Sequence, residues 1–518
     1  MSARPTPLPA TVEYWASSKP DDVAAVDGDV SLTWSQWNDA ANRVANALIA
    51  ADLGRDDVVV ARTQIRYEWL IVRLALGKVG CKLLGLNWRL TPSETQYVLA
   101  NSGAKAIFCD DADPEALLPA LKGLNLQLAV SISRPAKGYE FWDDILKTSA
   151  QPEHIAKSDP PLIIYTSGTT GLPKGVEMGQ HSFGDTEELR KYQKSVASRR
   201  PQLPGDVVLV TMPFNHGAGP ALIRTSVRAG NKMILQRRFD GEGVLDLIDR
   251  YKVTYWNGVP TMYKRLAGLP EDVLSKYDVS SIRTISVGAA PVTQELKAWI
   301  MSYFGECLDE GYGSTETSML TSISPDMQKV KPGSVGKPFD GVTLEIRSDD
   351  GEVLPTGEAG EIWARTPVTI RNYLNAPALP ADTLDEGGFF RTGDIGQLDE
   401  DGYLYISDRV KDMIISGGVN IYPAEIEAAL MRHDDVQDAA VFGIPNDEFG
   451  EEVMAVCELK PSRSATADEL ADHCATELSS YKRPRKIEII QELPRNSMGK
   501  ILKRTLRDPY WEGRERKV

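Results

Sequence analysis

The segment 160–176 reads PPLIIYTSGTTGLPKGV and joins an apolar run to a loop rich in glycine and hydroxyl groups. The run 160–165 is typical of a buried strand, so the loop is expected at a strand end, where α/β proteins bind ligands. Glycines allow backbone N–H groups to converge on an anion, and Ser, Thr and Lys side chains complete such a site. The segment predicts an α/β fold with a phosphate-binding loop, and a plain surface loop is the alternative.

This loop does not have the pattern of the nucleotide-triphosphatase P-loop. That motif places Ser or Thr directly after its lysine, whereas Gly175 follows Lys174 here. The hydroxyl that would bind magnesium is missing from that position, so Walker-type chemistry is disfavoured.

The composition limits the class of protein. The 518 residues include 58 Lys and Arg, 73 Asp and Glu and 5 Cys, with a net charge of −15. This length predicts two or more domains, and the negative charge argues against general affinity for nucleic acid or an anionic membrane. The scattered cysteines indicate neither a disulfide framework nor a zinc site. With no signal peptide or membrane-spanning stretch evident, a cytoplasmic location is expected.

Helical and strand-like patterns alternate from the N-terminal part to beyond residue 300. A helix is predicted over Thr33–Ala50, and strand-like runs are predicted at 58–62, 106–109, 206–211, 232–235 and 284–287. Such alternation indicates parallel sheets covered by helices.

The pattern changes from about residue 333, where short strands and turns predict a small β-subdomain. A run at 401–407 and a helix that begins at Pro423 follow. We therefore predict an N-terminal domain over 1–407, a hinge over 408–411 and a small, mobile α+β C-terminal domain over 412–518.

Further glycine-rich motifs follow the loop in a fixed order: MPFNHGAG (212–219), VGAAPV (287–292), GYGSTE (311–316), FFRTGD (389–394), SDRVKDMIISGG (407–418) and PRNSMGK (494–500). This series resembles the adenylate-forming superfamily of acyl-CoA synthetases, peptide-synthetase adenylation domains and beetle luciferases, from about residue 33 to residue 504. The resemblance implies that a carboxylate attacks the α-phosphate of ATP to give an acyl-adenylate and pyrophosphate. A thiol then takes the acyl group.

By this resemblance most motifs would bind ATP and Mg²⁺. Thr315 would bond the α-phosphate, Glu316 would hold Mg²⁺, and Asp394, on a tight turn, would accept from two ribose hydroxyls. A turn that caps a helix is the alternative for GYGSTE. The remaining nucleotide contacts implied are the phosphate loop, the adenine-side segments with the stacking tyrosine, and one arginine: Thr166, Ser167, Gly168, Thr169, Thr170, Lys174, Gly288, Ala289, Ala290, Pro291, Gly311, Tyr312, Gly313 and Arg409.

The same resemblance assigns the second half of the site to the C-terminal domain. Lys500 matches the lysine that approaches the carboxylate and the α-phosphate, where its charge would offset the repulsion between two anions. Lys411 occupies the hinge position, about which the small domain would rotate between the two steps. Ser416, Gly417 and Gly418 would line the pantetheine tunnel.

His216 would lie near the reacting carboxylate or gate the thiol channel, and a buried structural histidine is the alternative. The acyl pocket is expected between 214–218, 255–258 and 311–320. Core packing explains a lone Trp or Met, as at Trp256 and Met319, at least as well. The predicted wall residues are Phe214, Trp256, Asn257, Gly311 and Met319.

Among the members of this superfamily, a free-standing ligase fits best. No motif indicates the oxygen chemistry of a luciferase, and too few residues follow Lys500 for the carrier domain expected after a peptide-synthetase module. CoA is the predicted thiol, since Lys482, Arg483, Arg485 and Lys486 could pair with its ribose phosphate. Three alternatives stay open: a ligase that loads a carrier protein, an enzyme of only one half-reaction, and a non-catalytic binder of nucleotide or acyl-adenylate. The sequence does not distinguish fatty, aromatic and alicyclic acids, nor a homodimer from other oligomeric states.

Overall fold

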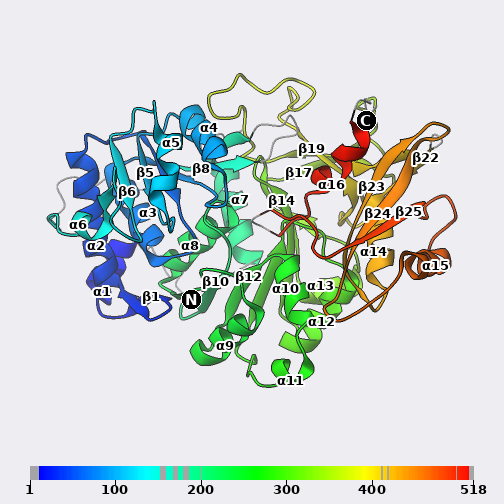
Figure 1. The fold of residues 1–518 in the computed structure, drawn as a ribbon, viewed down its shortest axis with the longest axis horizontal. Helices are drawn as coiled ribbons and strands as arrows, with labels where there is room; N and C mark the ends of the chain where they lie inside the picture. Colours follow the sequence, from blue (N-terminus) through cyan, green and yellow to red (C-terminus); the bar gives the residue numbers. More distant parts are fainter. Residues whose placement is uncertain are drawn as a thin grey trace.

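The protein has a large N-terminal domain built from helices and sheets and a small C-terminal domain with a mainly antiparallel sheet (Figure 1). The computed structural model describes residues 11–151, 159–166, 173–178, 186–199, 201–409, 412–416, 419–496 and 499–512. Within these residues the strands form four sheets. The predicted fold class is confirmed.

One sheet comes from the first third of the chain, in the strand order β7-β6-β5-β3-β4-β8-β9. Its central strands pair in parallel and are buried on both faces, as in β3, so they read as apolar runs. The bounds are β3 (Val58–Arg62), β4 (Lys82–Gly85), β5 (Ala106–Cys109), β6 (Leu128–Ser131), β7 (Glu140–Phe141), β8 (Leu162–Thr166) and β9 (Lys174–Met178). The helices between them are α3 (Tyr67–Val79), α4 (Pro92–Ser102), η1 (Pro114–Leu117), α5 (Leu118–Leu121) and α6 (Trp142–Ile145).

The second sheet has the order β16-β15-β14-β13-β12-β10-β11-β1-β2, with parallel pairing from β1 to β14 and antiparallel pairing at both edges. Its strands are β1 (Val23–Asp27), β2 (Val30–Thr33), β10 (Val207–Val210), β11 (Lys232–Leu235), β12 (Tyr255–Gly258), β13 (Thr284–Gly288), β14 (Leu308–Ser314), β15 (Ser318–Ile323) and β16 (Lys337–Pro338). The helices of this region are α1 (Val12–Ser18), α2 (Trp34–Ala50), α7 (Thr186–Arg199), α8 (Ala218–Ala229), α9 (Gly241–Tyr251), α10 (Pro260–Ala267), α11 (Glu271–Leu274), α12 (Gln294–Phe304) and α13 (Pro325–Val330).

The predicted local structure is confirmed with small shifts in the bounds. The predicted helix over Thr33–Ala50 is α2, and Thr33 is its N-cap, with a capping box that includes Gln36. The predicted strand at 160–165 begins two residues later, at Leu162, because the preceding prolines have no N–H to pair with a neighbouring strand.

The remaining strands form two smaller sheets. The predicted β-subdomain is an antiparallel sheet of β17 (Thr343–Arg347), β18 (Gly360–Arg365), β19 (Phe390–Leu398) and β20 (Leu404–Arg409). The C-terminal domain contains β21 (Ile414–Ser416), β22 (Val419–Ile421), β23 (Val436–Asn446), β24 (Gly450–Leu459) and β25 (Lys486–Ile490). Its helices are α14 (Pro423–Met431), α15 (Ala467–Glu477), α16 (Lys503–Arg507) and η3 (Asp508–Trp511).

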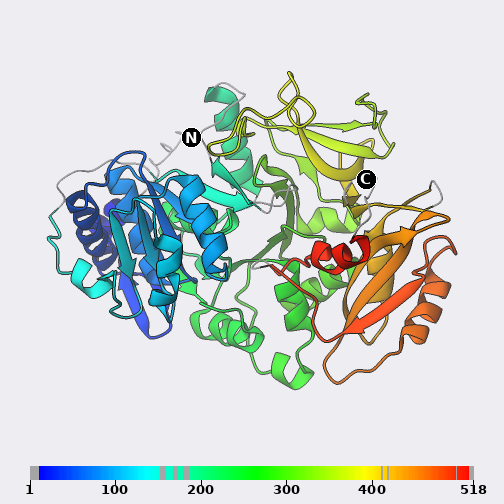
Figure 2. The same cartoon turned by 45° about the horizontal axis from the view of Figure 1, so that its top comes forward.

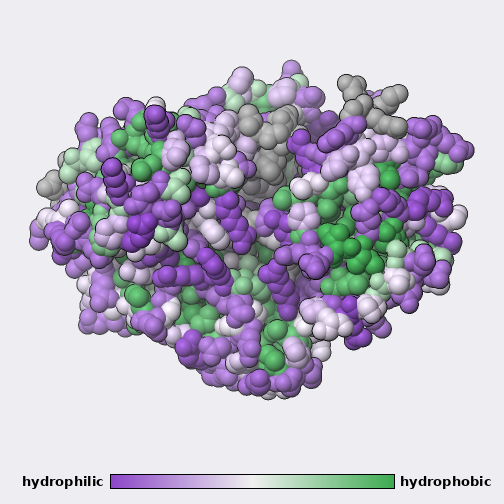
Figure 3. All heavy atoms as spheres, in the orientation of Figure 1, coloured by the Kyte–Doolittle hydropathy of each residue, from purple (hydrophilic) through white to green (hydrophobic). Residues whose placement is uncertain are grey.

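The C-terminal domain lies beside the part of the N-terminal domain that carries α10 and α12, as Figure 2 shows in orange and red against green. Figure 3 shows an apolar area on the side where Figure 1 places β24 and β25, and Ile489 and Leu502 of this domain are exposed. The predicted hinge at 408–411 begins within β20, which extends through Asp408 and Arg409. Lys411 lies outside the described residues, so the hinge and the domain boundary stay predictions. In the part of the chain that the structure describes, no helix is long and apolar enough to cross a membrane.

Candidate active site

Three of the predicted nucleotide-binding residues form one hydrogen-bonded group. Tyr312 lies in β14, Asp394 in β19 and Arg409 at the end of β20. Tyr312 Oη donates to Asp394 Oδ2 at 2.6 Å, and Arg409 Nε lies 2.8 Å from Asp394 Oδ1. Burial and the adjacent Asp394 carboxylate raise the pKa of Tyr312 well above its usual value, so its hydroxyl stays protonated. The carboxylate is therefore held in place and keeps unused lone pairs.

The prediction that Asp394 lies on a tight turn was wrong. Gly393 has a positive φ of +73°, which is the turn-like feature that FFRTGD suggests. Asp394 itself pairs with Arg409 across the antiparallel β19–β20 ladder. The pairing with β20 continues the strand through the glycine, and this long-range contact is absent from the local motif.

A second group joins the phosphate loop to the turn that contains Glu316. Lys174 Nζ lies 4.9 Å from the ring centroid of Tyr373, and Tyr373 Oη donates to Glu316 Oε1 at 3.3 Å. The backbone N–H of Ile370 donates to the Glu316 carbonyl at 3.0 Å. Burial and the Glu316 carboxylate raise the pKa of Tyr373, so it acts as a donor. Tyr373 was missed by the sequence reasoning, because it belongs to none of the motifs.

Strands β8 and β9 flank the predicted phosphate loop. Thr166 at the end of β8 pairs with Lys174 at the start of β9. Leu374 N donates to Gly175 O at 2.7 Å, which ties this hairpin to the segment that carries Tyr373. The loop residues Ser167, Gly168, Thr169 and Thr170 lie outside the described residues, so their contact with phosphate stays a prediction.

The motif GYGSTE forms the end of β14 and a turn that leads into β15. Thr315 and Glu316 lie in this turn, and Ser314 Oγ accepts from Thr317 N at 3.1 Å. The turn joins two strands, so the alternative of a helix cap was wrong. Gly313 lies so close to Ser318 O that a methyl group there would clash.

The segment after β13 brings backbone close to this turn. A methyl group added at Gly288 would lie 2.5 Å from the Gly311 carbonyl oxygen, so glycine is required there. Ala289 has a positive φ of +67°, which is unusual for a residue with a side chain. Ala289 and Pro291 are exposed, and Ala290 is half-buried. Strained backbone of this kind is common at binding sites.

His216 lies in the turn between β10 and α8, where its Nδ1 accepts from Ala218 N at 3.3 Å. Burial lowers the pKa of His216 to about 4, so the imidazole is neutral at pH 7. A neutral imidazole with this pKa is a weak base, which favours a positioning role over proton transfer.

The predicted acyl-pocket residues divide into two classes. Phe214 is 2% exposed and stacks on Trp69 with ring centroids 4.0 Å apart. Trp256 is fully buried, and its Nε1 donates to Thr211 Oγ1 at 2.9 Å. Both belong to the core, as the packing alternative expected for Trp256. Asn257, which donates to Ser286 Oγ, and Met319 are half-buried, so they stay candidates for the pocket wall.

Lys500 lies on a tight turn against the N-terminal domain. Lys500 N donates to Asn496 Oδ1, and Asn496 N donates to Lys500 O, both at 2.9 Å. Gly499 has a φ of +72°, and a methyl group there would clash with Thr261 at the start of α10. Lys500 itself is exposed. The turn therefore packs on α10, at the carboxyl end of the sheet that carries Gly288 and Tyr312.

A cavity of about 640 Å³ lies beside this turn, between the two domains. On the N-terminal side it is lined by the arginines Arg89, Arg237, Arg238 and Arg265. The ring of Trp88 also lines it and lies 5.0 Å from the guanidinium of Arg89 and 5.4 Å from that of Arg238. Aromatic and cationic groups in this arrangement suit a phosphorylated ring compound.

Comparisons with known proteins agree with these motifs. The family model described as AMP-binding enzyme matches residues 12–374, and the model of the AMP-binding enzyme C-terminal domain matches residues 425–500. The chain belongs to the AMP-binding enzyme family. The predicted resemblance to adenylate-forming enzymes is thereby confirmed.

Relatives in this family match over nearly the whole chain. The fatty acid–[acyl-carrier-protein] ligase ScoC of Streptomyces coeruleorubidus is 32% identical over 99% of this chain and 98% of its own. The 2-succinylbenzoate–CoA ligase of Geobacillus kaustophilus is 34% identical, and the match covers 97% of this chain and 98% of that one. The solved structure of o-succinylbenzoate CoA synthetase from Bacillus subtilis with ATP and magnesium has a TM-score of 0.80 and 29% identity, and the match covers 96% of this chain and 98% of that one.

The predicted CoA contacts lie elsewhere on this AMP-binding enzyme. Lys482 Nζ pairs with both oxygens of Glu425 at 2.7 Å, and Arg483 donates to two backbone carbonyls at 2.9 Å. Neither is among the described residues that line the cavity of arginines. Ser416 ends β21, and Gly417, Gly418 and Lys411 lie outside the described residues, so the tunnel and the hinge stay predictions.

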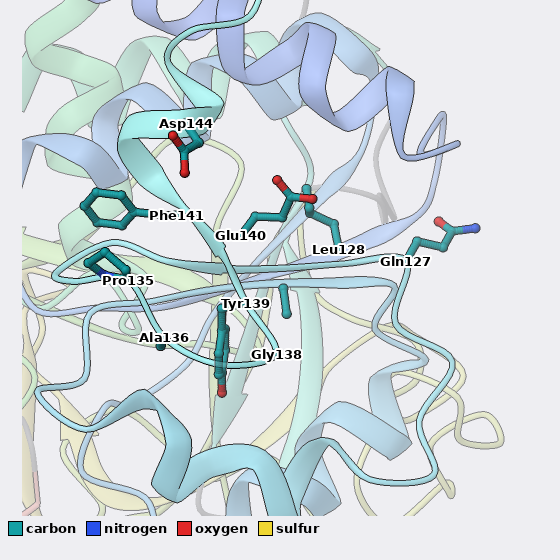
Figure 4. A pocket seen from close by; sticks show the side chains of 10 residues that line it. Gln127, Leu128, Pro135, Ala136, Gly138, Tyr139, Glu140, Phe141 and Asp144 are labelled. Carbon is teal, nitrogen blue, oxygen red and sulfur yellow. The ribbon is translucent and has the colours of Figure 1, made fainter.

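A separate hollow of about 510 Å³ lies near the β6–β7 edge of the first sheet (Figure 4). Its wall includes Tyr139, Glu140, Phe141 and Asp144. None of the described residues that line it is a predicted site residue, so it is not part of the candidate active site.

Proposed function

We propose that the protein is an acyl-CoA ligase that uses ATP and Mg²⁺ and transfers the activated acyl group to CoA. The broader activity is that of an AMP-forming acid–thiol ligase, which forms an acyl-adenylate and then a thioester. The solved relative with ATP and magnesium supports these two ligands. The finer assignments of acceptor and site residues are our proposal.

In the first step, a carboxylate oxygen attacks the α-phosphorus of ATP while the bond to the pyrophosphate oxygen breaks. Two anions must meet, so cations have to offset their repulsion. We assign this role to Lys500 and Lys174, with Thr315 as a donor to the α-phosphate. Asp394 would accept from the ribose hydroxyls, since Arg409 and Tyr312 hold its carboxylate in place.

Glu316 fits a divalent cation by the chemistry of its donor. Mg²⁺ prefers carboxylate oxygens together with phosphate, and Glu316 lies in the turn beside Lys174 and Tyr373. Bound there, Mg²⁺ would neutralise charge on the phosphates.

In the second step, the sulfur of the thiol attacks the acyl carbonyl carbon, and AMP leaves with the oxygen of the broken mixed-anhydride bond. The thiol loses its proton to solvent. His216 is neutral and weakly basic, so we assign it the positioning of the carboxylate or thiol rather than proton removal.

The observation that carries the choice of CoA is the interdomain cavity, with Trp88 and four arginines on its N-terminal side. CoA brings a phosphorylated nucleotide, which carrier-bound pantetheine lacks. Guanidinium groups pair well with phosphate, and an aromatic ring stacks on a base. The runner-up is a ligase that loads a carrier protein, because the relative ScoC is named as a fatty acid–[acyl-carrier-protein] ligase.

The acid is proposed as a carboxylic acid with a mainly apolar body. By name, the relatives act on fatty acids and on 2-succinylbenzoate, which differ greatly in shape. A screen of fatty, aromatic and alicyclic acids for AMP release that depends on both ATP and CoA would identify the substrate. Acid-dependent pyrophosphate exchange in that screen separates an enzyme from a non-catalytic nucleotide binder.

The choice of CoA is tested by two double variants. Replacing Arg89 and Arg238 with Ala removes two cations from the cavity, and we expect the KM for CoA to rise about tenfold or more, since each lost charged hydrogen bond costs about 1.5–3 kcal/mol. The KM for ATP and the rate of pyrophosphate exchange should stay unchanged. The matched control, Lys482→Ala with Arg483→Ala, changes two cations outside the cavity.

A larger rise in the KM for CoA in the Lys482 and Arg483 variant would move the CoA nucleotide to the C-terminal domain. Unchanged kinetics in both variants, together with efficient thioester formation on an acyl carrier protein, would replace CoA by a carrier protein as acceptor.

A further inference from the structure

We propose that Asp438 is a positioning residue for acyl-adenylate formation, because it ties the turn of Lys500 to helix α10 of the N-terminal domain. The proposal rests on the proposed function, since it requires Lys500 to act in adenylation. Asp438 belongs to none of the sequence motifs described above. It lies in β23 and is only 5% exposed.

The Asp438 carboxylate joins the two domains through a pair of cations. Oδ1 accepts from Lys264 Nζ at 3.0 Å, and Lys264 lies in α10 of the N-terminal domain. Oδ2 accepts from Arg495 Nη1 at 3.0 Å, and Arg495 directly precedes the turn of Lys500. Both cations are largely buried, with side-chain exposures of 17% and 12%. Hydrogen bonds between charged groups in such surroundings are strong and directional.

Arg495 carries this connection into the turn itself. Its Nη1 also lies 3.3 Å from the Gly499 carbonyl oxygen, one residue before Lys500. Its Nη2 donates to Glu458 Oε2 at 3.0 Å, which anchors the guanidinium on β24. One guanidinium thus contacts Asp438, Glu458 and the turn. Because the guanidinium is rigid and planar, a shift of Asp438 would displace the turn that carries Lys500.

Helix α10 provides the opposite side of the contact at two points. Thr261 meets Gly499 of the turn, and Lys264 meets Asp438. These two residues are three apart in a helix and therefore lie on the same face. One face of α10 thus holds both the turn of Lys500 and the residue that anchors it. Loss of either contact would let the turn shift relative to the N-terminal domain.

The expected consequence is specific to one half-reaction. A displacement of about 1 Å of a catalytic group costs about 100-fold in rate. Removing the negative charge of Asp438 would leave the backbone bonds of the turn intact and loosen its attachment to α10. Adenylation, which needs Lys500, should fall, whereas thioester formation from a supplied acyl-adenylate should not.

The experiment uses the full-length chain with three variants. Asp438→Asn removes the shared charge, Lys264→Met removes the partner in the N-terminal domain, and Arg463→Ala changes an exposed cation of the C-terminal domain as a matched control. Acid-dependent pyrophosphate exchange, thioester formation from supplied acyl-adenylate and thermal unfolding are measured for each. We expect exchange to fall about 10- to 100-fold in the first two variants, mainly in kcat. Thioester formation and the control should stay within about twofold of the original enzyme.

Lys264→Met keeps the proposal falsifiable even if Asp438→Asn fails to fold, because Lys264 lies outside the C-terminal domain. Exchange at the original rate in Lys264→Met would overturn the proposal. An equal loss of both half-reactions in Asp438→Asn, together with normal exchange in Lys264→Met, would assign Asp438 a purely structural role. If the unmodified enzyme shows no exchange with any acid, the proposed function fails instead. If Asp438 and Lys264 act as one unit, the double variant loses little more than either single variant.

Discussion

The two halves of the candidate site are held in different ways. Tyr312 of β14 donates to Asp394, and the pairing of β19 with β20 sets Asp394 opposite Arg409. The turn of Lys500 keeps its own shape but reaches the N-terminal domain through contacts across the domain boundary, at Thr261 and between Lys264 and Asp438. The nucleotide half is preorganised, whereas the lysine half depends on how the C-terminal domain is placed.

This difference has a chemical consequence. The ribose and the α-phosphate are present in both ATP and the acyl-adenylate, so residues that hold them should matter in both half-reactions. Charge neutralisation between carboxylate and α-phosphate is needed only while the adenylate forms. Variants of Lys500 and of Asp394 therefore separate charge neutralisation from nucleotide binding.

The largest effect is expected from Lys500→Ala. We expect acid-dependent pyrophosphate exchange to fall about 100- to 1000-fold or more, because the cation that offsets the repulsion between the two anions is lost. Thioester formation from supplied acyl-adenylate should survive. Arg463→Ala, which removes an exposed cation of the same domain, is the matched control. Equal loss of both half-reactions would contradict the role assigned to Lys500.

An intermediate effect is expected in the preorganised half. Asp394→Asn removes the negative charge that pairs with Arg409 and replaces one acceptor oxygen by an NH2 group, so we expect the KM for ATP to rise about 10- to 100-fold. Tyr312→Phe keeps the Asp394–Arg409 pair and loses one hydrogen bond, so the rise should be about tenfold or less.

Unlike Lys500→Ala, both of these variants should slow both half-reactions, since the acyl-adenylate carries the same ribose. Steady-state kinetics with ATP and with supplied adenylate measure this directly. An effect confined to adenylation would show that Asp394 does not hold the ribose.

The sequence predicted individual strands and motif glycines better than the contacts between separate elements. Strands such as β3, β5 and β11 have the predicted bounds because their apolar runs are local signals. Gly288 was selected by its motif, and its close approach to Gly311 O explains why glycine is present. We predicted Asp394 on a turn because the motif FFRTGD carries no signal of the pairing between β19 and β20, which joins separate segments of the chain.

The residues that the sequence did not reveal all act through long-range contacts. Tyr373 meets Lys174 and Glu316, and Lys264 meets Asp438 from a different domain. Neither local hydrophobic periodicity nor motif spacing encodes such a pairing, because it depends on how separate elements pack. For the same reason, the sequence did not decide whether Trp256 lies in the core or in the pocket wall. Its complete burial places it in the core.

The smallest effect concerns His216, in the turn between β10 and α8. Its pKa is about 4 in the folded protein, below the ordinary value of 6.5, because burial disfavours the charged imidazole. The stabilisation of the neutral form is therefore fully present above pH 6.5 and is lost as the pH falls through 4. Since the side chain is half-buried, we expect a loss of about 1–2 kcal/mol in unfolding free energy between pH 7.5 and pH 4.5.

The measurement compares urea unfolding of the original protein with that of His216→Asn across this pH range. Carboxylates that titrate in both proteins cancel in the difference, so the remaining change in relative stability reports on His216 alone. We expect the original protein to lose its advantage over the variant as the pH falls. A difference that stays constant from pH 7.5 to pH 4.5 would show that His216 is solvated in the folded state, and its proposed place beside the reacting carboxylate would then lose its physical basis.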